Sequence, residues 1–210
     1  MSICARAARR GGVWGLAICL GLMSGGDAAA QSIVRIEEDW ELKVATPDAQ
    51  QVAPQVTVTI SPRGGVMAEH ATFEINHQSE PDFVAGGLKL HGRIGDESIV
   101  ERRYHDEDVM SDESETVTWT QSMEIAPGVI RFAISNGSST TWGEFGEGDS
   151  LRVALDTELK NLNAYDPAVS VENSGAGFAG NRVRSLVLKR IRYHTDDGQV
   201  VIDDVPRTVE

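Results

Sequence analysis

Six carboxylates lie within ten residues of the chain, in the segment Asp106–Glu115 (DEDVMSDESE). Calcium in proteins takes about six to eight oxygen ligands, and clustered carboxylates can supply them. The spacing lacks the glycine and the Asp-x-Asp-x-Asp register of an EF-hand. Two interpretations therefore stay open, a solvated acidic loop or a Ca²⁺ site formed by Asp106, Glu107, Asp108, Asp112 and Glu113. The pairs Asp196–Asp197 and Asp203–Asp204 have the same two interpretations.

Aromatic side chains in turn-rich sequence are the second group that can bind a ligand. Trp142 and Phe145 lie in Ser138–Asp149 (SSTTWGEFGEGD), where no apolar alternation requires their burial. Tyr165 also lies near a predicted loop. Exposed rings stack on pyranose faces, so Trp142, Phe145 and Tyr165 are predicted sugar contacts. The alternative for Trp142 is a lid over one end of the fold.

Residue patterns typical of catalysis are weak. The five histidines have no short helical metal spacing. The nearest match to the Glu-x-Asp-x-x-Glu carboxylates of some jelly-roll glucanases is Glu74-Ile75-Asn76 followed by Glu80, which fails at two of three positions. There is no Gly-x-Ser-x-Gly motif either. We therefore expect no catalysis. The histidines are His70, His77, His91, His105 and His194.

The elements that must position these groups follow a period of two, which is typical of strands with one buried face. Apolar residues alternate in 34–44, 56–60, 71–75, 88–94, 117–125 and 130–134. In the first of these, Trp40 is predicted to lie in the core, as is Trp119 further on. The sequence predicts an all-β, antiparallel β-sandwich or jelly roll.

Turn residues predict two hairpins. Pro127–Gly128 joins the strands 117–125 and 130–134, the second of which is expected to end at Asn136–Gly137. The turn 195–198 joins 183–193 to 199–202. Segment 151–155 suits a strand better than the alternative helix, and the glycine-rich segment Asn173–Asn181 is predicted to be a loop.

The first thirty residues have the three parts of an export signal. Arg6, Arg9 and Arg10 precede the apolar run Gly12–Met23, and small residues follow at 28–30. Cleavage is predicted by Ala28 and Ala30, before Gln31. An apolar run of 12 residues is shorter than the roughly 20 that span a bilayer. We expect a secreted or periplasmic protein, with residues 31–210 as a single domain.

Composition excludes several classes of partner. Residues 31–210 have no cysteine, 16 basic residues and 31 acidic residues, a net charge of −15. That charge argues against nucleic acid, which requires a basic surface. No later segment is apolar for about 18 residues, so no membrane span is expected after the signal. No cofactor is indicated apart from the Ca²⁺ considered above.

Four segments resemble a group of uncharacterised exported all-β bacterial proteins. They are Glu38–Leu42 (EDWEL), Ala53–Val56 (APQV), Ile75–Phe83 (INHQSEPDF) and Phe178–Val183 (FAGNRV). The resemblance implies an exported all-β protein and no particular activity.

Together these patterns favour a non-catalytic binding module at the cell envelope, with a polysaccharide as its partner. The alternatives are a subunit that assembles with an envelope protein through a strand edge, and a glycoside hydrolase with carboxylates drawn from separate strands. The sequence does not determine the oligomeric state.

Overall fold

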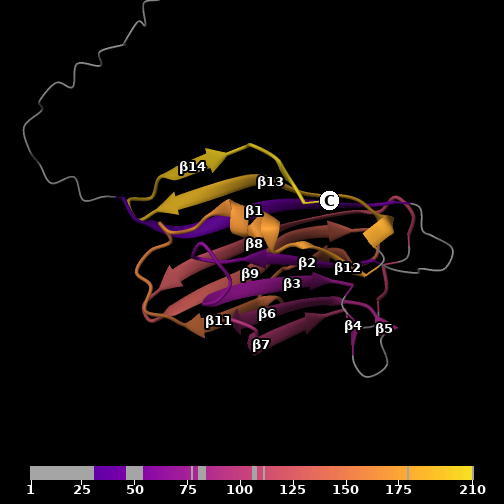
Figure 1. The fold of residues 1–210 in the computed structure, drawn as a ribbon, viewed down its shortest axis with the longest axis horizontal. Coiled ribbons are helices and arrows are strands. Elements are labelled where there is room, and N and C mark those ends of the chain that lie inside the picture. Colours follow the sequence, from indigo (N-terminus) through magenta and orange to yellow (C-terminus); the bar gives the residue numbers. More distant parts are fainter. Residues whose placement is uncertain are drawn as a thin grey trace, which may run out of the picture. The chain divides into compact units, whose positions relative to one another are not determined.

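Strands with one apolar face build two antiparallel sheets (Figure 1). The structure is a computed structural model, and it describes residues 31–45, 54–76, 78–79, 84–105, 108–110, 112–178 and 180–209. Within Gln31–Glu210, which form one compact unit, the sheets pack face to face. The predicted all-β sandwich is therefore confirmed.

The larger sheet has eight strands, in the order β10-β9-β8-β1-β13-β14, with β11 paired to β9 and β15 to β13. β1 is central because it pairs with both β8 and β13 along nearly its whole length. The strands are β1 (Ile33–Val44), β8 (Thr116–Ala126), β9 (Val129–Ser139), β10 (Gly143–Phe145), β11 (Arg152–Asp156), β13 (Val183–Thr195), β14 (Val200–Asp203) and β15 (Arg207–Thr208).

The smaller sheet has five strands in the order β12-β2-β3-β6-β7, and a separate short pair joins β4 to β5. β11 also contacts β6 and β7, so the two sheets meet along this side of the sandwich (Figure 1). The strands are β2 (Gln55–Ile60), β3 (Glu69–Ile75), β4 (Gln78–Ser79), β5 (Val84–Ala85), β6 (Leu88–Ile94), β7 (Glu97–Tyr104) and β12 (Gly175–Phe178).

The core contains large rings from both sheets. Trp40 and Trp119 are 1 % and 2 % exposed, as the alternation predicts. Their rings are stacked at 6.3 Å, and Phe73 of the smaller sheet meets Trp119 edge-on at 5.7 Å. Such pairs contribute about 0.5–1.5 kcal/mol beyond the area they bury.

A short helix, α1 (Pro167–Glu172), contacts β2. Asp166 caps it by accepting a hydrogen bond from the Ala168 N–H, and Pro167 occupies the first turn, where it has no N–H to leave unpaired. Its inward side chains include Val169 and Ser170, which are buried. A 3₁₀ turn, η1 (Gly180–Arg182), leads into β13.

The strand prediction for 151–155 is confirmed by β11, but two other expectations are wrong. β9 does not end at Asn136–Gly137: Asn136 takes a positive φ of 51°, the register with β8 shifts, and the strand continues to Ser139. The glycine-rich segment is not all loop, because Gly175–Phe178 forms β12 beside β2. β7 was not predicted, because its outer residues are charged rather than alternating.

No helix within the described part of the chain is long and apolar enough to cross a membrane. The predicted export signal, with Ala28 and Ala30, lies outside the described residues, so it stays a prediction.

Gly137 shows how the irregularity in β9 serves the core. A Cβ at this position would lie 2.2 Å from two ring carbons of Phe145. We expect Gly137→Ala to lower the free energy of unfolding by about 1–3 kcal/mol, because the Phe145 ring would have to shift. Gly64→Ala is the control, since a Cβ there meets nothing within 4 Å. Equal urea midpoints for the two variants would contradict this packing.

Candidate functional site

The outer face of the larger sheet, the side away from the core, carries long and short side chains in a regular arrangement. Because Phe132, Met123 and Val153 point into the core, their neighbours on each strand point outward. The register aligns these neighbours in two rows across β11, β9, β8 and β1. The rows are Ala154–Arg131–Glu124–Arg35 and Arg152–Ala133–Ser122–Glu37.

A cavity of about 570 Å³ lies over these rows. Small side chains from three neighbouring strands, Ser122, Ala133 and Ala154, leave room between longer ones. Four arginines and two carboxylates also line it, and β7 contributes one wall. The lining is Arg35, Val100, Arg102, Ser122, Glu124, Arg131, Phe132, Ala133, Asp149, Arg152, Val153 and Ala154. We call it the arginine cavity.

The four guanidinium groups differ in how far they are neutralised. Arg35 pairs with Glu37, and Arg152 lies 3.4 Å from the exposed Asp149. Arg102 and Arg131 make no ion pair with any described residue, although Arg102 donates to the Glu101 carbonyl. An anion entering the cavity would therefore meet two guanidinium groups that no carboxylate of the described chain occupies.

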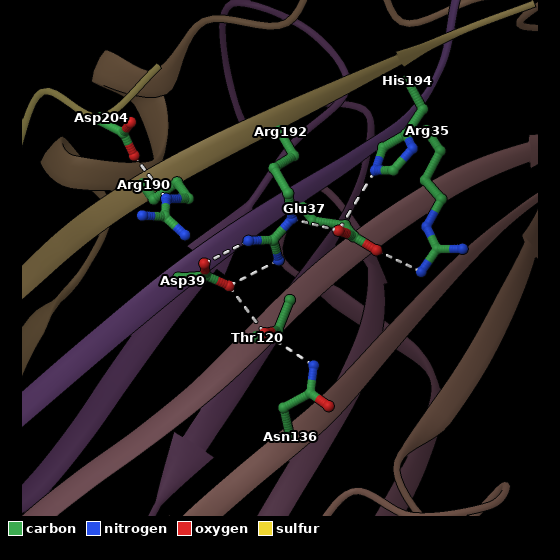
Figure 2. Close-up of polar contacts among 9 residues, drawn as sticks. All are labelled: Arg35, Glu37, Asp39, Thr120, Asn136, Arg190, Arg192, His194 and Asp204. Carbon is green, nitrogen blue, oxygen red and sulfur yellow. Dashed lines mark hydrogen bonds and ion pairs between the residues drawn. The ribbon is translucent and has the colours of Figure 1, made fainter. Parts of the chain in front are cut away.

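A network of charged side chains next to the cavity fixes Arg35 (Figure 2). Arg192 on β13 donates to both Asp39 oxygens at 2.5 and 2.8 Å, and its Nε donates to Glu37 at 2.6 Å. Thr120 on β8 donates to Asp39 at 2.8 Å and accepts from Asn136 on β9 at 3.2 Å. The network ties β1, β8, β9 and β13 together through their outer side chains.

The electrostatics of this network favour fixed charges. Burial by itself would raise the pKa of Glu37, but the hydrogen bond from Arg192 and the charges of Arg35 and Arg192 outweigh burial and lower the pKa. The hydrogen bond to Asp39 raises the pKa of Arg192. His194 lies 3.3 Å from Glu37 on the remaining side. Glu37 is therefore a stable anion that holds Arg35 at the rim of the cavity.

A second cavity, of about 590 Å³, follows the first along β9. Hydroxyl, amide and carboxylate groups line it together with glycines that bring the backbone to the surface. The lining is Ser135, Asn136, Gly137, Ser138, Glu144, Phe145, Gly146, Glu147 and Gly148. These groups can hydrogen-bond the hydroxyl groups of a ligand, but the lining contains no basic side chain that would pair with an anion.

The aromatic residues predicted as sugar contacts are not exposed rings. Trp142 is 4 % and Phe145 1 % exposed, and both belong to the core. Trp142 donates to the Asp108 carbonyl at 3.2 Å, so the alternative of a lid describes it better. Tyr165 is half-buried, and its hydroxyl donates inward to Glu38. The expectation of exposed stacking surfaces was wrong because Gly137 leaves space for the Phe145 ring, and because the Trp142 indole is held inward by its hydrogen bond to the Asp108 carbonyl.

The acidic segment is only partly described. Asp106 and Glu107 lie outside the described residues, while Asp112 and Glu113 are exposed. Asp108 pairs with His105 at 2.9 Å. Among the described residues, no group of three or more histidine, cysteine or acidic side chains is placed to hold a metal ion. The Ca²⁺ site stays a prediction. Glu115, expected in the same solvated loop, is instead buried and accepts hydrogen bonds from the Thr141 N–H and hydroxyl.

On the smaller sheet, a hydroxyl, an imidazole and a carboxylate lie in series. His91 contacts Ser98 Oγ at 2.9 Å through Nδ1 and Glu74 at 3.3 Å through Nε2. Burial would raise the pKa of Glu74, but His91 and Lys89 lower it to about 2. A hydrolytic relay also needs oxyanion donors and a cavity for the acyl group. Neither cavity described above is lined by these residues, so we assign them to the ion pairs of this sheet.

One acidic residue of β1 points into the core. Glu38 is fully buried between Ile36 and Trp40, and it accepts hydrogen bonds from Trp40 Nε1, Tyr165 and Ser170 at 2.9, 2.6 and 2.6 Å. Burial raises its pKa to about 7, although the three hydrogen bonds oppose the shift. Through Ser170 and Tyr165, Glu38 anchors α1 and the turn that precedes it to β1.

Sequence reasoning missed both Glu38 and the arginine cavity. Glu38 could have been found, because the alternation of Ile36, Trp40 and Leu42 places position 38 on the buried face. The cavity could not, because its arginines come from β1, β7, β9 and β11, and only the strand register brings them together.

No protein-family model matches the chain, and no curated protein matches it either. The resemblance to exported all-β bacterial proteins thus stays a prediction.

Glu38 makes stability depend on pH in a defined direction. The folded-state pKa of Glu38, about 7, exceeds the ordinary value of 4.5. The contribution of Glu38 to the free energy of unfolding is therefore fully present below pH 4.5 and is lost as the pH rises through 7. We expect Glu38→Gln to remove this loss, so that the variant gains about 3 kcal/mol on the wild type between pH 4.5 and pH 8. Urea unfolding at both pH values measures the gain.

Tyr165→Phe is the companion variant. It removes a donor that stabilises the ionised carboxylate, so we expect it to cost more stability at pH 8 than at pH 4.5. If neither variant changes the difference between the two pH values, Glu38 does not titrate in this range.

Proposed function

We propose that this chain is an exported, non-catalytic binding protein of the cell envelope whose ligand is an acidic glycan. The observation that carries the proposal is the arginine cavity, in which two of four guanidinium groups have no carboxylate partner among the described residues. A planar guanidinium binds a carboxylate or sulfate group through two parallel hydrogen bonds.

The position of the second cavity supports a glycan over a small inorganic anion. Both cavities are lined by β9, the first at Arg131–Ala133 and the second at Ser135–Ser138. A uronate or sulfated sugar carries its anionic group on a ring with several hydroxyl groups. The arginines would hold the anionic group, and the serine, asparagine and glutamate side chains would hold hydroxyl groups of a neighbouring sugar.

This site differs from the one that the sequence suggested, because it binds through polar side chains instead of aromatic stacking. The proposed role is still binding at the envelope. The proposed site is the outer face of the larger sheet instead of Trp142, Phe145 and Tyr165. The cavity volume lies within the range of about 300–1,000 Å³ typical of ligand sites.

Isothermal titration with polygalacturonate, and with neutral dextran as the comparison, tests the proposal. We expect polygalacturonate to bind and dextran not to bind. Arg131→Ala should weaken the binding of polygalacturonate about tenfold or more, because a hydrogen-bonded charge pair contributes about 1.5–3 kcal/mol. Arg184→Ala is the matched control: it removes the same charge from β13, outside the cavity.

Three outcomes would contradict the proposal: equal binding of dextran, equal losses in both variants, or no binding of either polymer. Duplex DNA at the same charge concentration separates recognition from general attraction of polyanions. We expect DNA to bind at least tenfold more weakly than polygalacturonate, because it does not fit a cavity of this size.

A further inference from the structure

Four of the seven exposed large apolar side chains of the described chain lie at one edge. Val200, Val201 and Ile202 of β14 are 48–55 % exposed, and Val205 just beyond is 62 % exposed. β14 is the last strand in the order of the larger sheet. Three consecutive β-branched residues on a terminal strand favour pairing with another strand.

Alternate residues of β14 direct their backbone N–H and C=O groups toward the open edge of the sheet. Thr195 N–H donates to the Gln199 carbonyl, so the next bonded pairs of the antiparallel ladder are Tyr193 with Val201 and Ile191 with Asp203. The N–H and C=O groups of Val200 and Ile202 therefore point away from β13, toward the open edge.

Another terminal strand is protected against such pairing. β7 ends the smaller sheet and carries Glu97, Glu101, Arg102 and Arg103 along its length. Charged side chains on an edge oppose the approach of a second strand. β14 carries no charge between Gln199 and Ile202.

The charges around β14 decide which strand can pair with it. Asp196 and Asp197 precede it and form no ion pair with any described residue, while Asp203 and Asp204 at its end pair with Arg207 and Arg190. In antiparallel pairing with a second copy, aspartates of both copies would approach one another at the two ends of β14, and like charges across strands destabilise pairing. The net charge of −15 on residues 31–210 of each copy opposes it further.

We propose that the open edge of β14 binds an extended segment of another protein, antiparallel to β14, with β-branched residues in its centre and lysine or arginine at its ends. The centre packs on Val200, Val201 and Ile202, and the basic ends approach the flanking aspartates. Backbone hydrogen bonds to Val200 and Ile202 provide affinity, as in other cases of strand addition.

Two capped peptides test the proposal, Lys-Val-Thr-Val-Thr-Val-Lys and its twin with glutamate at both ends. Fluorescence anisotropy with the purified protein should show the lysine peptide binding at least fivefold more tightly. Ile202→Lys should weaken binding of the lysine peptide at least tenfold. Ile99→Lys is the matched control because Ile99 on β7 is 48 % exposed, close to the 54 % of Ile202, and it should change binding less than twofold.

Ile202→Pro separates backbone pairing from charge, since it removes the outward N–H and adds no charge. Ile202→Pro should weaken binding of the lysine peptide as strongly as Ile202→Lys does, while circular dichroism shows unchanged strand content. If that content falls, hydrogen exchange on the wild type decides instead. The peptide should slow exchange at Val200 and Ile202 and leave Val201 unchanged.

Three results would overturn the proposal: equal affinity for the two peptides, equal losses in the Ile202→Lys and Ile99→Lys variants, or no binding of either peptide. A dimer that forms with rising concentration and is lost in Ile202→Lys would assign the edge to a second copy instead.

Discussion

The guanidinium of Arg192, held between Glu37 and Asp39, is the interaction on which the outer face of the larger sheet depends (Figure 2). β1 has a charged residue at each outward position from Arg35 to Lys43, and it lies in the middle of the sheet. A central strand with so many charges is stable only if its neighbours neutralise them. An isolated exposed ion pair contributes less than about 1 kcal/mol. The half-buried Arg192 guanidinium instead bridges two carboxylates, and one of them, Asp39, also accepts a hydrogen bond from Thr120 on β8. Its geometry also leaves Arg35 directed at the arginine cavity.

Adjacent residues of β1 show how strongly the side of a sheet decides the behaviour of a carboxyl group. Glu37 and Asp39 point outward to arginine, and the pKa of Glu37 is lowered. Glu38 points inward to three neutral donors, and burial raises its pKa to about 7. The same residue type thus contributes a fixed charge on one face and a titrating group on the other. The outward charge holds Arg35 at the arginine cavity, and the inward one couples α1 to the core.

Period-two alternation was enough to predict most of the sandwich, because a strand with one buried face leaves that pattern regardless of its neighbours. It failed where burial did not follow the pattern. β7 carries charge as an edge strand, and Gly137 lets β9 continue past a sequence typical of a turn. Glu38 could have been placed on the buried face from the pattern, but the pattern does not reveal the hydrogen-bond donors that allow a carboxyl group to be buried there. The arginine cavity depends on the alignment of strands from separate parts of the chain, and alignment is a property of pairing that no single segment reveals.

An acidic protein can keep a cationic binding site because charge acts over short distances at physiological salt, where the Debye length is about 8 Å. The four arginines line the cavity itself, so a ligand there would contact them directly, and acidic side chains more than a Debye length away would oppose it only weakly. The two proposed surfaces are also independent. The cavity lies over β11, β9, β8 and the Arg35 end of β1, and the open edge belongs to β14, with β13 between them. A protein strand at β14 would therefore extend the sheet without covering the arginines, so that a glycan and a protein partner could be held at the same time.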